Sequence, residues 1–185
     1  MSRIRISGGA WRSRLIQVID APGLRPTPDR VRETLFNWLG QDLTGWRCLD
    51  LFAGSGVLGI ECASRGAAEV VLVERDAKAF GRLQQNVAAF DAAGLLRPVR
   101  ADALEFAFAA AQQGSRFDLV LLDPPYRQGW LERVAPLLPA LAQPGMRVYA
   151  EAEYRIESLG NWRTVKRGQA GQVFYHLLEN SLEQS

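Results

Sequence analysis

The sequence is poor in the residues that build disulfides, metal centres and histidine-dependent active sites. Among 185 residues there are two cysteines, Cys48 and Cys62, and one histidine, His176. The cysteines are far from any CxxC spacing, which argues against a disulfide framework and a zinc site, so we expect both to be small core residues. A single histidine in a late strand allows no Ser-His-Asp arrangement. No metal site is predicted, and a structural role is expected for His176.

Long apolar runs are missing as well. Uncharged stretches are short or interrupted by proline, as in residues 135–146, so no bilayer-spanning segment is predicted. The N-terminus alternates arginine with apolar residues and lacks the apolar core of a signal peptide. At 48% hydrophobic residues the chain can bury one sizeable core with a small appendage. We therefore expect a cytoplasmic monomer without a membrane partner.

Lysine is scarce, and the basic residues that remain are unevenly placed. Only Lys78 and Lys166 are lysines, and the net charge is +2. Residues 1–32 carry seven arginines against two aspartates, whereas the rest of the chain is net acidic. Guanidinium groups gathered at one end of a near-neutral domain favour a polyanion such as nucleic acid. The alternative is a solvated surface in a chain with a general preference for arginine.

The first forty residues read as a hairpin followed by a helix. Residues 3–18 alternate arginine and apolar side chains around a glycine turn, which predicts a β-hairpin with one basic face. Thr27 is predicted to cap a helix that has Pro28 at its first position and ends at Gly40. We predict a basic hairpin arm over residues 1–26 and one catalytic domain over residues 27–185. The expected apolar stripe of the helix consists of Val31, Leu35, Trp38 and Leu39.

Strand-like and helix-like segments then alternate. Short apolar runs alternate with helical patterns, which predicts an open, mostly parallel α/β sheet with helices on both faces. The expected strands are 48–52, 70–73, 98–100, 117–122 and 146–150, and the expected helices are 57–65, 77–90, 103–112 and a proline-broken 131–141. A closing hairpin is predicted from residues 162–166 and 173–178.

A carboxylate, two prolines and an aromatic ring follow one of the buried strands. Asp123, Pro124, Pro125 and Tyr126 come directly after the apolar run 117–122. An exocyclic amine on a nucleobase is a poor nucleophile, because its lone pair is delocalised into the ring. If Asp123 accepts one N–H and the Pro124 carbonyl the other, the lone pair turns toward an incoming methyl group while Tyr126 stacks on the base. The alternative is that these residues have no catalytic role and form only a turn that ends the strand.

A glycine-rich turn at the front of the sheet predicts a nucleotide-like cofactor. Gly54, Gly56 and Gly59 satisfy GxGxxG, which nicotinamide enzymes also use, and Glu74 would suit a ribose diol in either case. Asp50, four residues ahead of the first glycine, would repel a pyrophosphate but suits a ligand with a cationic amine. S-adenosylmethionine has that amine.

The order of the acids supports the same cofactor. Asp50, Glu74, Asp102 and Asp123 each follow a predicted parallel strand and therefore meet at one edge, where ligands of open α/β sheets bind. Each acid alone also reads as a helix cap or a solvated loop residue. The predicted cofactor-binding residues are Asp50, Phe52, Gly54, Ser55, Gly56, Glu74, Arg75, Asp102, Ala103 and Asp123.

The motifs resemble one bacterial methyltransferase family. The runs at 5–12, 24–37 (LRPTPDRVRETLFN), 49–56 (LDLFAGSG) and DPPY at 123–126 look like the RsmD-type enzymes. The resemblance covers nearly the whole chain and departs only slightly, at Val57 and Cys62. It implies a Rossmann-like, seven-stranded class I methyltransferase fold. It also implies methylation of guanine N2 in 16S ribosomal RNA of a partly assembled small subunit.

The hairpin arm is the expected RNA-binding element, and rival functions remain open. The predicted RNA-binding residues are Arg3, Arg5, Trp11, Arg12, Arg14, Arg25 and Arg30, with packing of Trp11 onto the sheet as an equal alternative. An adenine-N6 or cytosine-N4 methyltransferase can carry a similar motif, but only residues 127–144 are available for a target-recognition insert. Protein-amide methylation fits less well because its motif begins with Asn. A nucleotide-binding module without catalysis is the rival from another class.

Overall fold

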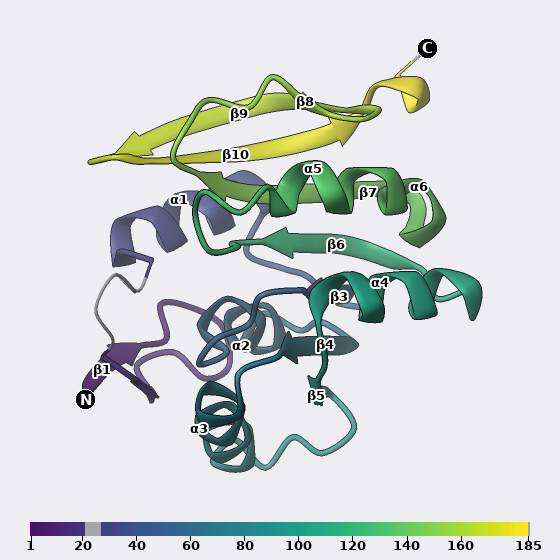
Figure 1. The fold of residues 1–185 in the computed structure, drawn as a ribbon. Helices are drawn as coiled ribbons and strands as arrows, with labels where there is room; N and C mark the ends of the chain where they lie inside the picture. Colours follow the sequence, from purple (N-terminus) through teal and green to yellow (C-terminus); the bar gives the residue numbers. More distant parts are fainter. Residues whose placement is uncertain (21–26, 185) are drawn as a thin grey trace.

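The computed structural model describes residues 1–20 and 27–184, which form a two-stranded hairpin and one large sheet (Figure 1). The strands are β1 (Ser2–Arg5), β2 (Leu15–Val18), β3 (Arg47–Asp50), β4 (Glu69–Glu74), β5 (Leu96–Arg100), β6 (Phe117–Leu122), β7 (Ala142–Ala152), β8 (Ser158–Leu159), β9 (Trp162–Ala170) and β10 (Val173–Asn180). The helices are α1 (Asp29–Leu39), α2 (Val57–Ser64), α3 (Ala77–Ala88), α4 (Ala103–Gln112), α5 (Trp130–Val134) and α6 (Leu138–Leu141), with 3₁₀ turns η1 (Ala135–Leu137) and η2 (Ser181–Glu183).

The large sheet has the order β5-β4-β3-β6-β7-β10-β9-β8. Strands β5, β4, β3, β6 and β7 are parallel, and β10 enters antiparallel between β7 and β9. The predicted fold class is confirmed, and the two-residue β8 adds an eighth strand to the seven expected. The chain winds outward from β3 to β4 and β5, then returns to place β6 on the other side of β3. In open α/β sheets, ligands bind in the crevice at such a reversal, which here lies at the carboxyl ends of β3 and β6.

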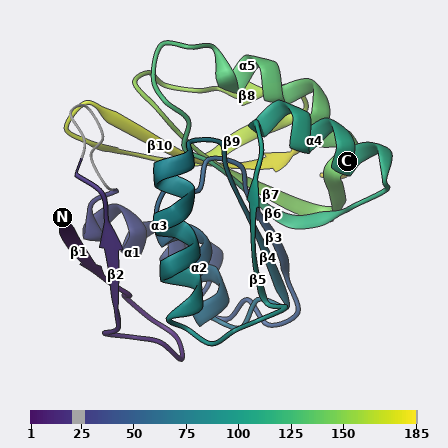
Figure 2. The ribbon, with the colours of Figure 1, turned by 60° about the horizontal axis from the view of Figure 1, so that its bottom comes forward.

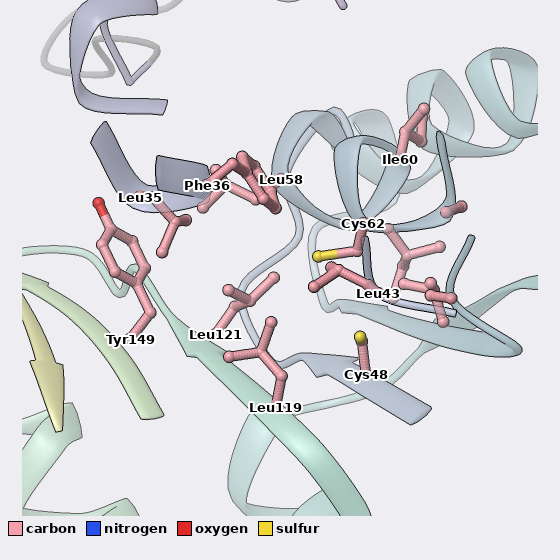
Figure 3. Packing of buried hydrophobic residues seen from close by; sticks show 14 of the residues in the cluster. Leu35, Phe36, Leu43, Cys48, Leu58, Ile60, Cys62, Leu119, Leu121 and Tyr149 are labelled. Atoms are coloured by element: carbon pink, nitrogen blue, oxygen red, sulfur yellow. The ribbon is translucent and has the colours of Figure 1, made fainter. Parts of the chain in front are cut away.

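Helices cover both faces of the sheet because successive strand residues point to opposite sides. Figure 2 shows α1, α2, α3 and the hairpin on one side, with α4 and α5 on the other. Leu119 and Leu121 of β6 belong to the first core, and Val120 and Leu122 to the second. In Figure 3, Leu119, Leu121 and Tyr149 point toward the residues of α1 and α2. Cys48 and Cys62 are buried, unpaired members of the same core, as expected.

The start of α1 differs from the prediction. Pro28 occupies the cap position without any side-chain cap, so the prediction that Thr27 caps this helix is wrong. The Thr27 hydroxyl instead donates to Glu151 Oε1, 3.1 Å away at the end of β7. The end of the helix agrees with the prediction, because Gly40 adopts φ 92°, a left-handed conformation that favours glycine.

The hairpin is docked onto the domain. Ile4, Ile6 and Ile16 are buried, so the alternation that makes one face basic makes the other face part of the core. Gly9 approaches the end of α2 so closely that a Cβ would overlap the Ser64 carbonyl, and that carbonyl accepts from the Ala10 amide at 2.7 Å. The boundary of the proposed arm at residue 26, and Arg25 with it, lie outside the described residues.

A buried ionic cluster, here called the Glu61 network, joins the hairpin to α1 and α2. Glu61, fully buried, accepts from Arg32 at 2.8 Å and from Arg65, and the Ser7 amide donates to it at 2.8 Å. Arg32 also pairs with Asp29. Arg32 is therefore a buried structural residue that links α1 to α2, whereas the neighbouring Arg30 is exposed.

His176 is buried in β10 and fully engaged by backbone groups. Its Nε2 accepts from the Ile156 amide at 3.0 Å, and its Nδ1 lies 3.1 Å from the Ala150 carbonyl. These contacts require a proton on Nδ1 and none on Nε2. Burial lowers the pKa of His176, which favours this neutral form.

Candidate active site

Four carboxylates end neighbouring strands at one edge of the sheet. Asp50 ends β3, Glu74 ends β4, Asp123 follows β6, and Glu151 lies near the end of β7. The parallel registers place Asp50 beside Leu121, and Leu122 beside Ala150. Adjacent parallel strands lie about 4.8 Å apart, so Asp123 and Glu151 are next to each other, with Asp50 on the other side of Asp123.

The glycine turn is tied to β4 through Glu74. The Gly54 amide donates to Glu74 Oε2 and the Asp76 amide to Oε1, both at 2.9 Å. Carboxylate oxygens have spare lone pairs, so the held carboxylate can still accept from a ribose diol. Gly54 and Gly56 have φ values of 55° and 92°. A Cβ at Gly56 would lie 2.6 Å from Leu83 Cδ1, so glycine at this position allows α3 to pack directly against the turn.

Ser55 is connected to the hairpin by a residue that the sequence did not single out. Asn86 of α3 is buried and donates to the carbonyls of Ser55 and Gln17, both at 2.8 Å. Its Oδ1 accepts from the Gln17 amide at 3.2 Å. Because Gln17 belongs to β2, the hairpin and the glycine turn share one side chain.

The position of Asp50 disfavours the charged form of its carboxyl group. It is buried, and its Oδ1 accepts from the Phe52 amide at 3.4 Å. Burial raises the pKa of Asp50 to about 7, with a further contribution from Glu74, while the Phe52 amide acts in the opposite direction. A buried carboxylate that has no ion-pair partner within residues 1–20 and 27–184 is well suited to receive the ammonium of an amino-acid-like ligand.

Asp102 caps α4 and lies close to Arg75. Its Oδ1 accepts from the amides of Leu104 and Glu105 at 2.9 and 3.2 Å, which leaves Ala103 in the first turn. Oδ2 lies 3.9 Å from Arg75 Nη1. The two predicted cofactor residues Arg75 and Asp102 therefore come together at the end of β4 and β5.

Phe52 and Tyr126 present rings on the same side of the crevice. Phe52 is half-buried and makes an edge contact with Trp130, with ring centroids 5.5 Å apart. Tyr126 is 41% exposed, so its ring is available to a ligand, and burial of its hydroxyl end raises the pKa of Tyr126 to about 12. Pro124 is buried beneath it and Pro125 is exposed.

Asp123 and Glu151 form a pair that the sequence did not predict. The two carboxyl groups are within hydrogen-bonding reach of each other. Burial raises the pKa of Asp123 well above its usual range, the Glu151 charge adds to this, and a hydrogen bond with Thr27 opposes it. Glu151 is also held by the Tyr149 hydroxyl, 2.6 Å from Oε1. The signal was available, since Glu151 follows an apolar strand just as Asp123 does.

A small cavity of about 80 Å³ opens beside the pair. Its floor is made by Pro124, Pro125 and Glu151, and its wall by Tyr126 and Trp130. On the far rim Tyr154 donates to Glu132 at 2.6 Å. The site thus combines a row of acidic strand ends beside the glycine turn with an aromatic, proline-lined cavity next to Glu151.

Among the described residues, four of the predicted RNA-binding arginines lie on the hairpin and Arg30 lies in α1. Arg3, Arg12 and Arg30 are exposed. Arg5 donates to the Ser13 carbonyl at 3.0 Å, and Arg14 donates to the Ala89 carbonyl at 2.6 Å. Arg14 also lies over the Phe90 ring, 4.2 Å from its centroid.

Trp11 packs inward. Its ring is half-buried and lies 4.6 Å from Phe90, which is the packing role that the sequence left open. Within residues 1–20 and 27–184, no group of three or more His, Cys, Asp or Glu side chains is arranged to hold a metal ion. No helix in the same ranges is both long and apolar enough to cross a membrane.

Comparison with known proteins identifies relatives of the whole chain. The family model described as conserved hypothetical protein 95 matches residues 4–179. The chain is 43% identical to ribosomal RNA small subunit methyltransferase D of Escherichia coli, over 98% of this chain and 92% of that protein. The solved structure of yhhF from Escherichia coli has a TM-score of 0.84 and 40% identity, covering 97% of this chain and 98% of that one. An RNA methyltransferase from Salinibacter ruber, solved with S-adenosyl-L-homocysteine, shares the fold at a TM-score of 0.65 and 20% identity, with 84% and 94% coverage.

Proposed function

This chain belongs to the conserved hypothetical protein 95 family, the RsmD-type methyltransferases, and we propose from that premise that it methylates the exocyclic N2 of one guanine in 16S ribosomal RNA. The methyl donor is S-adenosylmethionine, which supplies an electrophilic sulfonium methyl group. The observation that carries the proposal is the position of Asp123, between the crevice at the glycine turn and the cavity lined by proline and tyrosine.

The residues at the glycine turn fit the donor. Asp50 receives its ammonium, because the buried carboxylate has no cationic partner among the described residues. Glu74 accepts from the ribose hydroxyls, and Asp102 with the Ala103 amide holds the adenine edge. Phe52, Ser55 and Arg75 complete the walls. A Cβ at Gly54 would meet no atom within 4 Å, which leaves room for the methionine part beside this glycine.

The residues of the DPPY motif orient the amine. Asp123 accepts one N2–H and the Pro124 carbonyl accepts the other, which turns the nitrogen lone pair toward the crevice. Pro125 keeps that carbonyl aimed, and Tyr126 stacks on the base and sets its plane. Positioning of this kind contributes up to about 7–11 kcal/mol to lowering a barrier. After transfer the excess proton passes to Asp123 or to water.

The substrate is proposed to be a partly assembled small subunit in the cytoplasm, bound by a monomeric enzyme. A guanine in a loop is already unpaired, which lowers the cost of drawing it into the cavity. The arm over residues 1–26 is the proposed RNA-binding element, with residues 27–185 as the catalytic domain. Its contacts would come from Arg3, Arg5, Trp11, Arg12, Arg14, Arg25 and Arg30.

One experiment tests the function directly. Small-subunit particles from cells that lack the endogenous activity are incubated with the protein and labelled S-adenosylmethionine, and the modified nucleotide is mapped. We expect label on N2 of a single guanine in the particles. Label on adenine or cytosine amines would replace guanine with another amino substrate, and donor binding without transfer to any RNA would support a non-catalytic module.

A further inference from the structure

Glu151 is the buried acid of the site that the proposed chemistry leaves without a task. It is 4% exposed and lies one strand away from Asp123. A carboxyl group removed from water in this way costs free energy unless partners compensate it. Such a residue beside the reacting groups is a candidate for substrate recognition.

The orientation of Glu151 is set by two hydroxyl groups on one of its oxygens. Tyr149 donates to Oε1 at 2.6 Å and Thr27 donates to the same atom at 3.1 Å. Within residues 1–20 and 27–184, no N–H and no Ser, Thr or Tyr hydroxyl donates to the second oxygen, Oε2, and Glu151 lines the cavity together with the two prolines. Apart from its contact with Asp123, the carboxyl group is therefore held by one oxygen and retains acceptor capacity on the other.

The pairing with Asp123 limits what can bind beside it. Two facing carboxyl groups are stable only with hydrogen between them, and the two groups here are within hydrogen-bonding reach. A ligand that presents two adjacent donors supplies the hydrogens itself, so both acids can face it as carboxylates. Against two carboxylates, a ligand with one donor and one acceptor leaves a lone pair opposite one of them.

Guanine presents the required pattern. Its N1–H lies next to the N2 amino group on one edge, so N1–H and one of the two N2–H bonds point the same way. Adenine N1 and cytosine N3, which flank the amino groups of those bases, are acceptors. A carboxylate at that place rejects them while it accepts from guanine.

We propose that Glu151 is the residue that selects guanine, by accepting the N1–H while Asp123 and the Pro124 carbonyl hold the N2 amine. This inference rests on the proposed function and adds a determinant of base specificity to it. Tyr149 and Thr27 act as positioning residues, because their hydroxyls hold the carboxyl group that makes the contact.

The test replaces the target guanine with 2,6-diaminopurine. That base keeps the 2-amino group but has an acceptor at N1. After the modified guanine has been mapped, particles are reconstituted with ligated RNA that carries either base at that position. The quantity measured is the ratio of kcat/KM for guanine to kcat/KM for 2,6-diaminopurine. For the wild-type protein we expect a ratio of at least about 100, since a buried acceptor left facing another acceptor is strongly disfavoured.

Glu151→Gln is the informative variant. Its carboxamide keeps the shape of the acid but can turn an N–H toward an N1 acceptor, so we expect the ratio to fall at least about tenfold. Glu132→Gln removes one charge from the rim of the same cavity and is expected to leave the ratio unchanged. Donor affinity, measured by calorimetry, verifies that each variant is folded.

A second variant covers the case in which Glu151→Gln does not fold. Tyr149→Phe keeps the ring in the core and removes one hydroxyl from Oε1, and we expect the ratio to fall several-fold. A folded Glu151→Gln protein with the wild-type ratio would overturn the inference, as would an equal fall in Glu132→Gln. If the wild-type protein methylated no guanine in any particle, the proposed function itself would be overturned.

Discussion

At the scale of single residues, Asp123 separates transfer from donor binding. Asp123→Ala removes an acceptor that orients the amine but leaves the glycine turn and Asp50 untouched. We expect methylation of small-subunit particles to fall by about 10²–10³-fold, by analogy with loss of a preorganised hydrogen-bonding group. Donor affinity should change by less than threefold. Near-normal turnover by this variant would remove Asp123 from the chemistry.

The buried carboxyl group of Asp50 is expected to favour donor binding but to lower the stability of the fold at high pH. Its pKa in the folded protein is about 7, above the ordinary value of 3.8, so the folded state binds the proton more tightly than the unfolded chain. The stability from this difference is complete below about pH 4 and is lost as the pH rises through 7. At pH 8 the buried charge therefore destabilises the fold by up to about 4 kcal/mol.

Asp50→Asn should remove that pH dependence. We expect urea unfolding of the donor-free variant to require more denaturant than wild type at pH 8, and about the same at pH 4. Donor affinity should fall at least tenfold, because the ammonium loses its counter-charge. A variant that is no more stable than wild type at pH 8 would show that the pKa of Asp50 is not raised in the folded protein.

The residues that the sequence predicted and those it missed differ in a physical way. Asp50, Glu74 and Asp123 were predictable because each ends an apolar run, and parallel strands bring such ends together. Glu151 was missed because the strand before it is followed by several acids without a motif. The packing of Trp11 could not be predicted, because its ring partner Phe90 is 79 residues away in the sequence and a local sequence pattern contains no information about such a contact.

At the scale of elements, helices and buried strands followed periodicity closely. Helix α4 has the predicted bounds Ala103–Gln112, because Asp102 provides both a cap and a start signal. Strand β7 begins at Ala142, four residues earlier than predicted. Pro144 and Gly145 are typical turn residues in the sequence, but in the structure they lie inside the strand, whose first residue pairs with Phe117 of β6. The local sequence predicts a helix cap at Thr27, because the residue that accepts its hydrogen bond in the structure, Glu151, is 124 residues away and cannot be found from local sequence.

The proposed role of the hairpin in RNA binding can be tested at Arg12 and Arg14. Replacing Arg12 and Arg14 with serine should weaken binding to small-subunit particles and reduce the slope of log affinity against log salt by about 1–2, through loss of phosphate contacts. A matched pair of exposed arginines far from the hairpin, Arg97 and Arg163, should leave the slope unchanged when replaced. Equal slopes for wild type and the hairpin variant would assign these two arginines to the fold alone, where Arg14 already holds the Ala89 carbonyl.

At the scale of the whole molecule, the Glu61 network determines whether the hairpin stays docked. Glu61→Gln would leave the buried guanidinium groups of Arg32 and Arg65 without their counter-charge. Breaking a buried pair in this way costs about 3–5 kcal/mol, which should appear as a lower urea midpoint. Glu69→Gln, which breaks the partly exposed pair with Arg47, should cost no more than about 1 kcal/mol. Similar midpoints for the two variants would show that the network is dispensable.

The same network also imposes an order on biosynthesis. Ser7 precedes Glu61 by 54 residues, so during synthesis the hairpin emerges well before the carboxylate that its amide contacts. Until α2 has been translated, Ile6 has no pocket and the basic strands have nothing to dock onto. Ribosomal RNA is the nearest polyanion to a nascent chain, so docking of the hairpin once α2 has formed withdraws its apolar face from non-specific contact while the chain is still being made.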